Sequence, residues 1–126
     1  MLKMLNNPAL PAPMGYSHAV EATGTQKMLF VSGQVGVRAD GSVPDSAGEQ
    51  AKIAVANVNA MLAQAGMANT DIAKVTIYLT DDSLLPGFMQ AAGGTVSTPP
   101  PATTLLIVKA LAVPGLLIEI EAVAHD

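Results

Sequence analysis

Two of the few carboxylates that could do chemistry stand close together near the carboxyl terminus. Glu119 and Glu121 alternate with apolar residues in Ile118-Glu119-Ile120-Glu121. A period of two predicts a strand and places both carboxylates on one face. A glutamate held beside a reacting molecule can manage the proton of an attacking water. A solvated strand edge would carry the same pair, and the spacing alone favours that structural interpretation.

The other candidate catalytic groups give weaker signals. His18 and His125 lie far apart without a carboxylate-rich motif, so we expect no metal site. Ser17 and Ser32 lack the Gly-x-Ser-x-Gly setting of a nucleophilic serine. The chain has no cysteine, which excludes disulfides and a thiolate nucleophile. The sole arginine, Arg38, stands beside an Asp-Gly turn and is interpreted as a solvated loop charge.

The composition describes one small domain with few charges. The chain has 126 residues, which suits a single domain over residues 1–126. Charged residues make up 13% of the chain, against a usual share of roughly 25%. A surface so poor in charge would leave apolar area exposed in a monomer, which favours an oligomer.

Charge and hydropathy argue against several classes of partner. The formal net charge is −4 and the sequence shows no basic patch, so nucleic-acid binding has no electrostatic support. No apolar run reaches the ~18 residues that a membrane span needs. Residues 1–7 lack the apolar segment of a signal peptide. We therefore expect a cytoplasmic protein without a membrane partner.

The elements that must position these residues begin with two predicted strands. Residues 16–21 and 27–32 have strand composition, and Gly24 between them marks a turn, so we predict a hairpin. The run Met28-Leu29-Phe30-Val31 is continuously apolar, which is typical of a strand buried on both faces.

A long helix gives the clearest local signal. Ser46 and Glu49 form the S-x-x-E pattern of a capping box, in which each side chain satisfies a free backbone N–H. Apolar residues follow at helical spacing, and Gly66 suits the C′ position because it tolerates a positive φ. We predict this helix over residues 47–65.

The second half of the chain predicts three strands and a further helix. Residues 71–80 alternate between apolar side chains and a polar set that includes Tyr78. A second helix is predicted over 84–92, and strands over 102–110 and 116–124. The resulting order, β-β-α-β-α-β-β, indicates an α/β (α+β) fold, a mixed sheet with both helices on one face. The helix-free face would be exposed in a monomer.

Four segments, read together, resemble one known family. They are Gly15-Tyr16-Ser17-His18, Phe30-Val31-Ser32-Gly33-Gln34, Pro101-Ala102-Thr103-Thr104 and Ile118-Glu119-Ile120-Glu121-Ala122-Val123-Ala124. Their order and spacing are similar to those of the RidA (YjgF) family, also labelled endoribonuclease L-PSP, over residues 7–124. The resemblance implies a chorismate-mutase-like fold and a homotrimer whose helix-free sheet faces pack together, with ligand clefts between subunits. It also implies hydrolysis of reactive enamines and imines to a keto acid and ammonia, without a cofactor.

The resemblance also implies roles for particular residues. Glu119 matches the glutamate that orients the attacking water, and Tyr16 matches a tyrosine near the site. Ser32, Gly33 and Gln34 match a loop edge whose backbone contacts a ligand.

Two positions depart from the family pattern. Thr103 stands where active members have an arginine that clamps the substrate carboxylate, and a neutral hydroxyl cannot replace that clamp. Met89 stands where the family has an asparagine. Thr103 and Thr104 could still donate hydrogen bonds to a neutral or smaller substrate.

Three functional hypotheses follow. The leading one is a RidA-type hydrolase or deaminase of an imine, enamine or related small metabolite, with substrate scope altered by Thr103. The alternative is a trimer that keeps the cleft only to bind or sense a small molecule. A ribonuclease follows only from the family label, and the acidic composition argues against it.

Overall fold

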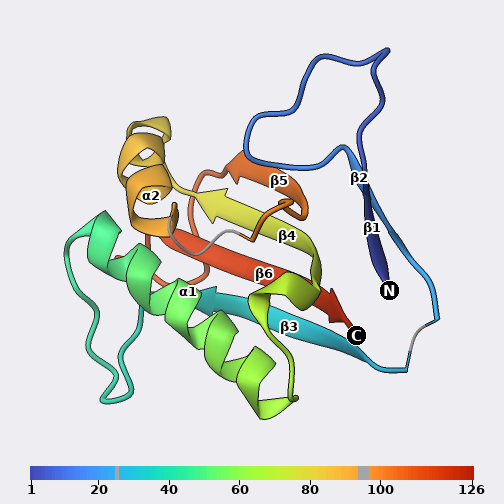
Figure 1. Ribbon diagram of the computed structural model, residues 1–126. Coiled ribbons are helices and arrows are strands. Elements are labelled where there is room, and N and C mark those ends of the chain that lie inside the picture. Colours follow the sequence, from blue (N-terminus) through green and yellow to red (C-terminus); the bar gives the residue numbers. More distant parts are fainter. Residues whose placement is uncertain (25, 94–96) are drawn as a thin grey trace.

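A four-stranded mixed sheet carries two helices on one of its faces (Figure 1). The computed structural model describes residues 1–24, 26–93 and 97–126. Both helices pack against the same face, which confirms the predicted α+β architecture. The elements of this layer pair are β3 (Met28–Val35), α1 (Ala47–Gln64), β4 (Ile72–Leu79), α2 (Leu85–Ala92), β5 (Ala102–Ile107) and β6 (Ile118–His125).

The strand order within the sheet is β3-β6-β4-β5. β6 is antiparallel to both of its neighbours, whereas β4 and β5 are parallel. A parallel pair needs a crossover connection, and α2 lies in the segment that joins β4 to β5. Short 3-10 turns, Asn69–Asp71 and Asp82–Leu84, precede β4 and α2.

The hydrophobic core lies between α1, α2 and the helix-covered face of the sheet. The alternation predicted for the last strand is confirmed, because Ile118, Ile120, Ala122 and Ala124 are buried while the residues between them are half-buried. Apolar residues of α1 at helical spacing meet them. This packing fixes which face each β6 side chain occupies.

The predicted start and end of α1 agree with the structure to within a residue. The Ser46 hydroxyl accepts a hydrogen bond from the backbone N–H of Glu49 at 3.3 Å, and Gly66 adopts a φ of 73° after the helix ends. The Glu49 carboxylate lies 3.4 Å from Nη2 of Arg38. The residue expected to close the capping box therefore holds the loop arginine.

The predicted hairpin of residues 16–21 with 27–32 is wrong. The strand in this region, β2 (Ala19–Ala22), pairs antiparallel with β1 (Leu2–Leu5) in a separate two-stranded sheet. Gly24 does take a positive φ of 64°, but its turn leads out of this small sheet toward β3. Figure 1 shows the pair, in blue, beside the edge of the main sheet.

The His18 ring holds the loop between β1 and β2. Its Nδ1 accepts from the backbone N–H of Asn7 at 3.0 Å, and its Nε2 lies 2.9 Å from the carbonyl of Pro11. These contacts fit the neutral tautomer that carries its hydrogen on Nε2. His18 therefore has a structural role in returning the chain to β2, which local turn signals could not reveal.

The prediction that the apolar run of β3 is buried on both faces is also wrong. Val31 is 6% exposed, whereas Phe30 is 72% and Met28 50% exposed. β3 is an edge strand of a sheet with helices on one face only. A continuous apolar run occurs both in strands that are covered on two faces and in strands whose second face is uncovered in a single copy. The periodicity of the sequence does not distinguish these two kinds of strand.

The buried amide of Gln50 ties two loops to α1. Its Nε2 donates to the carbonyls of Pro44 and Gly115 at 2.9 and 3.0 Å, and its Oε1 accepts from the N–H of Leu117 at 2.9 Å. A Cβ on Gly36 would lie 2.5 Å from Gln50, so this approach requires glycine. Gln50 thus fixes the entry into β6.

Within the described ranges, neither helix has the length and apolarity that crossing a bilayer requires.

Candidate functional site

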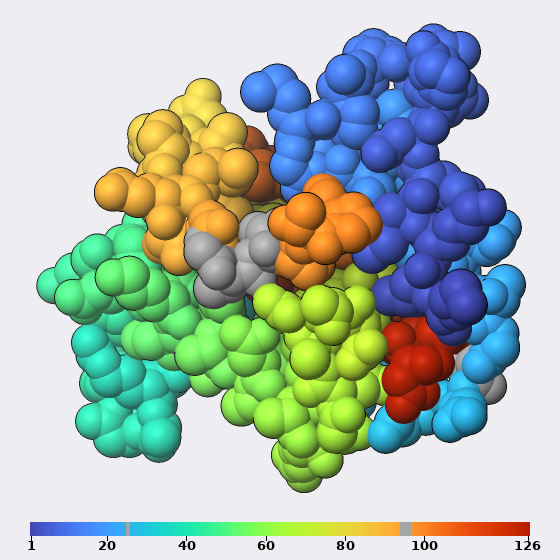
Figure 2. Space-filling model, in the orientation of Figure 1, coloured from blue at the N-terminus to red at the C-terminus, as the bar shows by residue number. Residues whose placement is uncertain are grey.

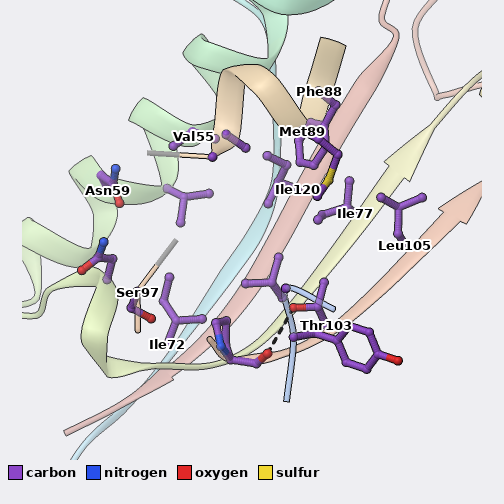
Figure 3. A pocket seen from close by; sticks show the side chains of 18 of the residues that line it. Val55, Asn59, Ile72, Ile77, Phe88, Met89, Ser97, Thr103, Leu105 and Ile120 are labelled. Atoms are coloured by element: carbon purple, nitrogen blue, oxygen red, sulfur yellow. Dashed lines mark hydrogen bonds between the residues drawn. The ribbon is translucent and has the colours of Figure 1, made fainter. Parts of the chain in front are cut away.

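A cavity of about 310 Å³ lies between the helices and the helix-covered face of the sheet. Figure 3 shows side chains of Ile72, Ile77, Leu105 and Ile120 from the sheet region facing Val55 and Asn59 of α1 and Phe88 and Met89 of α2. The cavity volume is at the lower end of the roughly 300–1,000 Å³ typical of small-molecule sites. The remaining lining residues are Met14, Gly15, Tyr16, Val58, Asn69, Val75, Ala92, Gly93, Ser97, Pro101 and Thr103.

The segment that carries Tyr16 is attached to the strand that carries Thr103. Ser17 is buried, and its hydroxyl donates to the carbonyl of Pro100 at 2.6 Å. Its backbone N–H donates to the carbonyl of Pro101 at 3.1 Å. Figure 2 shows the amino-terminal segment (blue) lying beside the chain near residue 100 (orange). Two residues predicted for the site, Tyr16 and Thr103, are thereby brought to one cavity.

Thr103 presents a hydroxyl oxygen in the cavity. It is paired with Val75 across the parallel strands, so both side chains point to the helix-covered face. Its Oγ1 donates to the carbonyl of Pro101 at 3.2 Å (Figure 3). Met89 lies at the cavity edge and is 52% exposed. The arginine of this chain, Arg38, is engaged by Ser42 and Glu49 instead.

Glu119 lies on the opposite, open face of the sheet. The β3–β6 register shifts between Val31 and Gln34, so Ser32 and Gly33 form a bulge. The Glu119 side chain lies against this bulge, because a Cβ on Gly33 would be 2.7 Å from its Cδ. The side-chain amide of Gln34 donates to the Ser32 carbonyl at 3.1 Å and braces the bulge. Of the predicted edge Ser32, Gly33 and Gln34, the structure thus places Gly33 against Glu119.

The second glutamate of the pair has a partner on the same open face. The Tyr78 hydroxyl donates to Oε1 of Glu121 at 2.5 Å. This bond, followed by partial burial and the charges of Glu121 and Glu119, raises the pKa of Tyr78 above its ordinary value of 10.0. Glu121 is therefore a structural partner. Glu119 makes no hydrogen bond or ion pair with the described part of the chain.

Lys74 and Thr104 form a further contact on the open face. Nζ of Lys74 donates to Oγ1 of Thr104 at 2.6 Å. Thr104 was predicted for the site together with Thr103, but successive strand residues point to opposite faces, so the sheet separates them. Lys74 and Thr76 also line a second hollow of about 320 Å³ on this face. Sequence alternation placed Lys74 among the polar residues, but its contact depends on which strands are neighbours.

The predicted site residues thus fall into two groups. Tyr16 and Thr103 line the cavity on the helix-covered face, whereas Glu119 and Gly33 meet on the open face. One copy of the chain does not bring the two groups into a single cleft. Among the residues that the structure describes, no group of three or more His, Cys, Asp or Glu side chains could hold a metal ion.

Comparisons with known proteins agree with the architecture. Residues 6–126 match the family model described as Endoribonuclease L-PSP. A RutC family protein of Aquifex aeolicus is 40% identical over 82 residues, which span 64% of this chain and 63% of that protein. An Escherichia coli protein named putative reactive intermediate deaminase TdcF is 32% identical over 82 residues, spanning 64% and 62%. These matches cover less than two thirds of either relative.

A solved structure extends the likeness over the whole fold. The Yersinia pestis protein YyfB, described as a protein of unknown function of the conserved Rid family, superposes with a TM-score of 0.81. The two are 28% identical, and the match covers 99% of this chain and 98% of that one.

Proposed function

This chain belongs to the Endoribonuclease L-PSP (RidA/YjgF) family, and we propose that it hydrolyses a reactive imine or enamine and releases ammonia. The family includes proteins named reactive intermediate deaminases. The residue at position 103 leads us to propose that its substrate scope differs from that of members with the arginine. The homotrimer that the resemblance implies would supply the clefts.

The proposed reaction needs only water as a co-reactant. A water oxygen bonds to the carbon of C=N, and the π electrons move to nitrogen, which gains a proton and gives a carbinolamine. The C–N bond then breaks as the hydroxyl proton is transferred to nitrogen, which leaves as ammonia, and the oxygen lone pair forms C=O. An enamine first takes a proton on carbon to become the imine. A carboxylate beside the reacting carbon can take the proton of the water and return it to the departing nitrogen.

The state of Glu119 is the observation that supports this proposal most. Of the two β6 glutamates, Glu121 is held by Tyr78, while Glu119 is without a hydrogen bond or ion pair in the described part of the chain. Its side chain rests on the glycine of a β-bulge, a feature that often re-aims side chains beside active sites. The contact with Gly33 therefore holds the Glu119 side chain in place, and its carboxylate oxygens remain available to water.

A complete site takes groups from two copies in this proposal. The cavity with Tyr16 and Thr103 and the carboxylate of Glu119 lie on opposite faces of one sheet. Phe30 and Met28 leave apolar surface exposed on the open face or its edge, and such surface favours association. Packing this face beside the β5 edge of a second copy would cover it and bring one copy's Glu119 toward the Thr103 end of the other copy's cavity.

The test is ammonia release from imines made in situ. An amino-acid oxidase supplies imines that carry a carboxylate, and an amine oxidase supplies imines without one. The protein should accelerate release from at least one class, and Glu119→Gln should lower that acceleration by about a hundredfold or more without changing the melting temperature. Glu21→Gln, on the exposed part of β2, is the matched control. Spontaneous rates with both classes would contradict the proposal.

A small-molecule binding protein without turnover is the second candidate. The uncharged cavity favours it, because that cavity can hold a ligand without help from Glu119. Saturable stabilisation by a ligand, combined with no product from either class of imine, would select this candidate.

A further inference from the structure

The cavity on the helix-covered face has no charged lining. None of its described lining residues is Asp, Glu, Lys, Arg or His. Lys74 points to the other face, where it donates to Thr104, and Arg38 is paired with Glu49. An ionised carboxylate that entered this cavity would lose its hydration without gaining a counter-charge, which is unfavourable.

The Thr103 hydroxyl also disfavours a carboxylate in this cavity. A hydroxyl has one proton and two lone pairs, and here the proton is donated to the carbonyl of Pro101. Thr103 therefore presents an acceptor to the cavity, and the prediction that it donates a hydrogen bond to a ligand is wrong, because Pro101 already takes its proton. An acceptor attracts an N–H or O–H group of a ligand and repels a carboxylate oxygen.

Apolar side chains dominate the rest of the cavity. Val55, Ile77, Phe88 and Leu105 line the same cavity as Thr103 (Figure 3). Each buried CH₂ group contributes about 0.8 kcal/mol, so a small aliphatic group would bind here through burial. Asn59 is exposed at the α1 side and leaves the rim polar.

From these three features we infer that the cavity binds an uncharged small molecule that combines a short apolar group with an N–H donor to Thr103. This inference rests on the proposed function where it names the substrate class: an imine or enamine that places no carboxylate beside Thr103. The site thereby selects neutral ligands over the carboxylate-bearing ligands for which an arginine would be needed.

A matched pair of stable probes tests the inference without requiring catalysis. Isovaleramide and isovalerate have nearly the same shape, but the amide is neutral with N–H donors and the acid is an anion. Isovaleramide should bind saturably and at least tenfold more tightly, a difference of about 1.4 kcal/mol. In methyl NMR spectra its addition should shift the Val55 and Leu105 signals and leave exposed Val113 unchanged. Equal binding, or tighter binding of isovalerate, overturns the inference.

Substitutions locate the selection at Thr103. Thr103→Arg should reverse the preference toward isovalerate, because a guanidinium pairs with a carboxylate. Val55→Phe should fill the cavity and abolish binding of the amide, while Ala56→Phe, on the exposed side of the same helix, should keep it. Circular dichroism checks that each variant is folded. If Val55→Phe fails to fold, the NMR shifts on the wild-type protein still decide the site. Unchanged amide binding in folded Val55→Phe also overturns the inference.

Turnover separates this inference from the proposed function. Imines made from isoamylamine and from leucine share the same side chain and differ in the carboxylate. Faster ammonia release from the isoamylamine imine supports both claims. Selective binding of isovaleramide without turnover of either imine removes the proposed function and leaves the inference intact. Preferred turnover of the leucine imine supports the proposed function and overturns the inference.

Discussion

The two faces of the sheet differ in chemistry although the same strands build both. The helix-covered face carries an uncharged cavity in which Thr103 is an acceptor. The open face carries Lys74, Tyr78, Glu119 and Glu121, of which Tyr78 and Glu121 are hydrogen-bonded to each other and Lys74 donates to Thr104. In the proposed function, one face holds the ligand and the other moves the proton.

Strand geometry explains why the two sets are separated. Successive side chains alternate between faces, so Thr103 and Thr104 are one residue apart yet serve different faces. A site that needs both the cavity and a carboxylate must therefore combine faces from two copies.

The approach of Glu119 to Gly33 gives the largest effect. Gly33→Ala would place a Cβ 2.7 Å from Cδ of Glu119, and the carboxylate would have to turn away. Because the displaced group is a flexible side chain, the fold should persist while ammonia release falls about a hundredfold. Gly48→Ala is the control, since its Cβ would meet only Oγ of Ser46 at 3.7 Å. Full activity in Gly33→Ala would show that the position of Glu119 does not matter.

The buried Gln50 should affect stability instead. Gln50→Ala leaves the carbonyls of Pro44 and Gly115 and the N–H of Leu117 without this partner. We expect a loss of about 2 kcal/mol in the free energy of unfolding, measured by urea denaturation. Gln64→Ala, exposed on the same helix, should change it by less than about 0.5 kcal/mol. An equal loss in both variants would contradict the role of the Gln50 amide.

The Tyr78–Glu121 hydrogen bond on the open face should give the smallest effect, a shift in the titration midpoint of Tyr78. The chain has two tyrosines, so Tyr16→Phe leaves Tyr78 as the source of tyrosinate absorbance. Its midpoint should lie above the ordinary pKa of 10.0 and should fall toward that value in Glu121→Gln. The hydrogen bond needs the Tyr78 proton, so its stabilisation is complete below the ordinary pKa and is lost as pH rises through the raised one. An unchanged midpoint would exclude Glu121 as the cause.

Most elements could be predicted from the sequence because their signals are local. The Ser46 cap and Gly66 marked α1, and the alternation along residues 118–124 placed Glu119 and Glu121 on the strand face opposite the buried apolar residues. The β-β-α-β-α-β-β order also led to the helices on one face. The order omitted β1, because a short strand near the prolines gave no distinct pattern.

The rest depends on long-range pairing that local patterns do not encode. β2 pairs with β1, and their paired residues lie between 14 (Leu5 with Ala19) and 20 (Leu2 with Ala22) positions apart in the sequence. The exposure of Phe30 and Met28 in β3 arises because helices cover only one face of the main sheet. The contacts of Ser17 with Pro100 and of Gln50 with Gly115 span 83 and 65 residues. The family resemblance grouped Tyr16, Thr103 and Glu119 as one site, and only the strand register shows that a single copy divides them.

Complementation between two inactive variants tests the two-copy site most directly. Glu119→Gln keeps the cavity and Val55→Phe keeps the carboxylate, so each should be inactive alone. Co-expressed with different tags and purified through both, every cyclic heterotrimer would contain one site of three with an intact cavity facing an intact Glu119. We predict recovery of roughly one third of the wild-type rate of ammonia release. Heterotrimers that stay as inactive as either variant alone would contradict it.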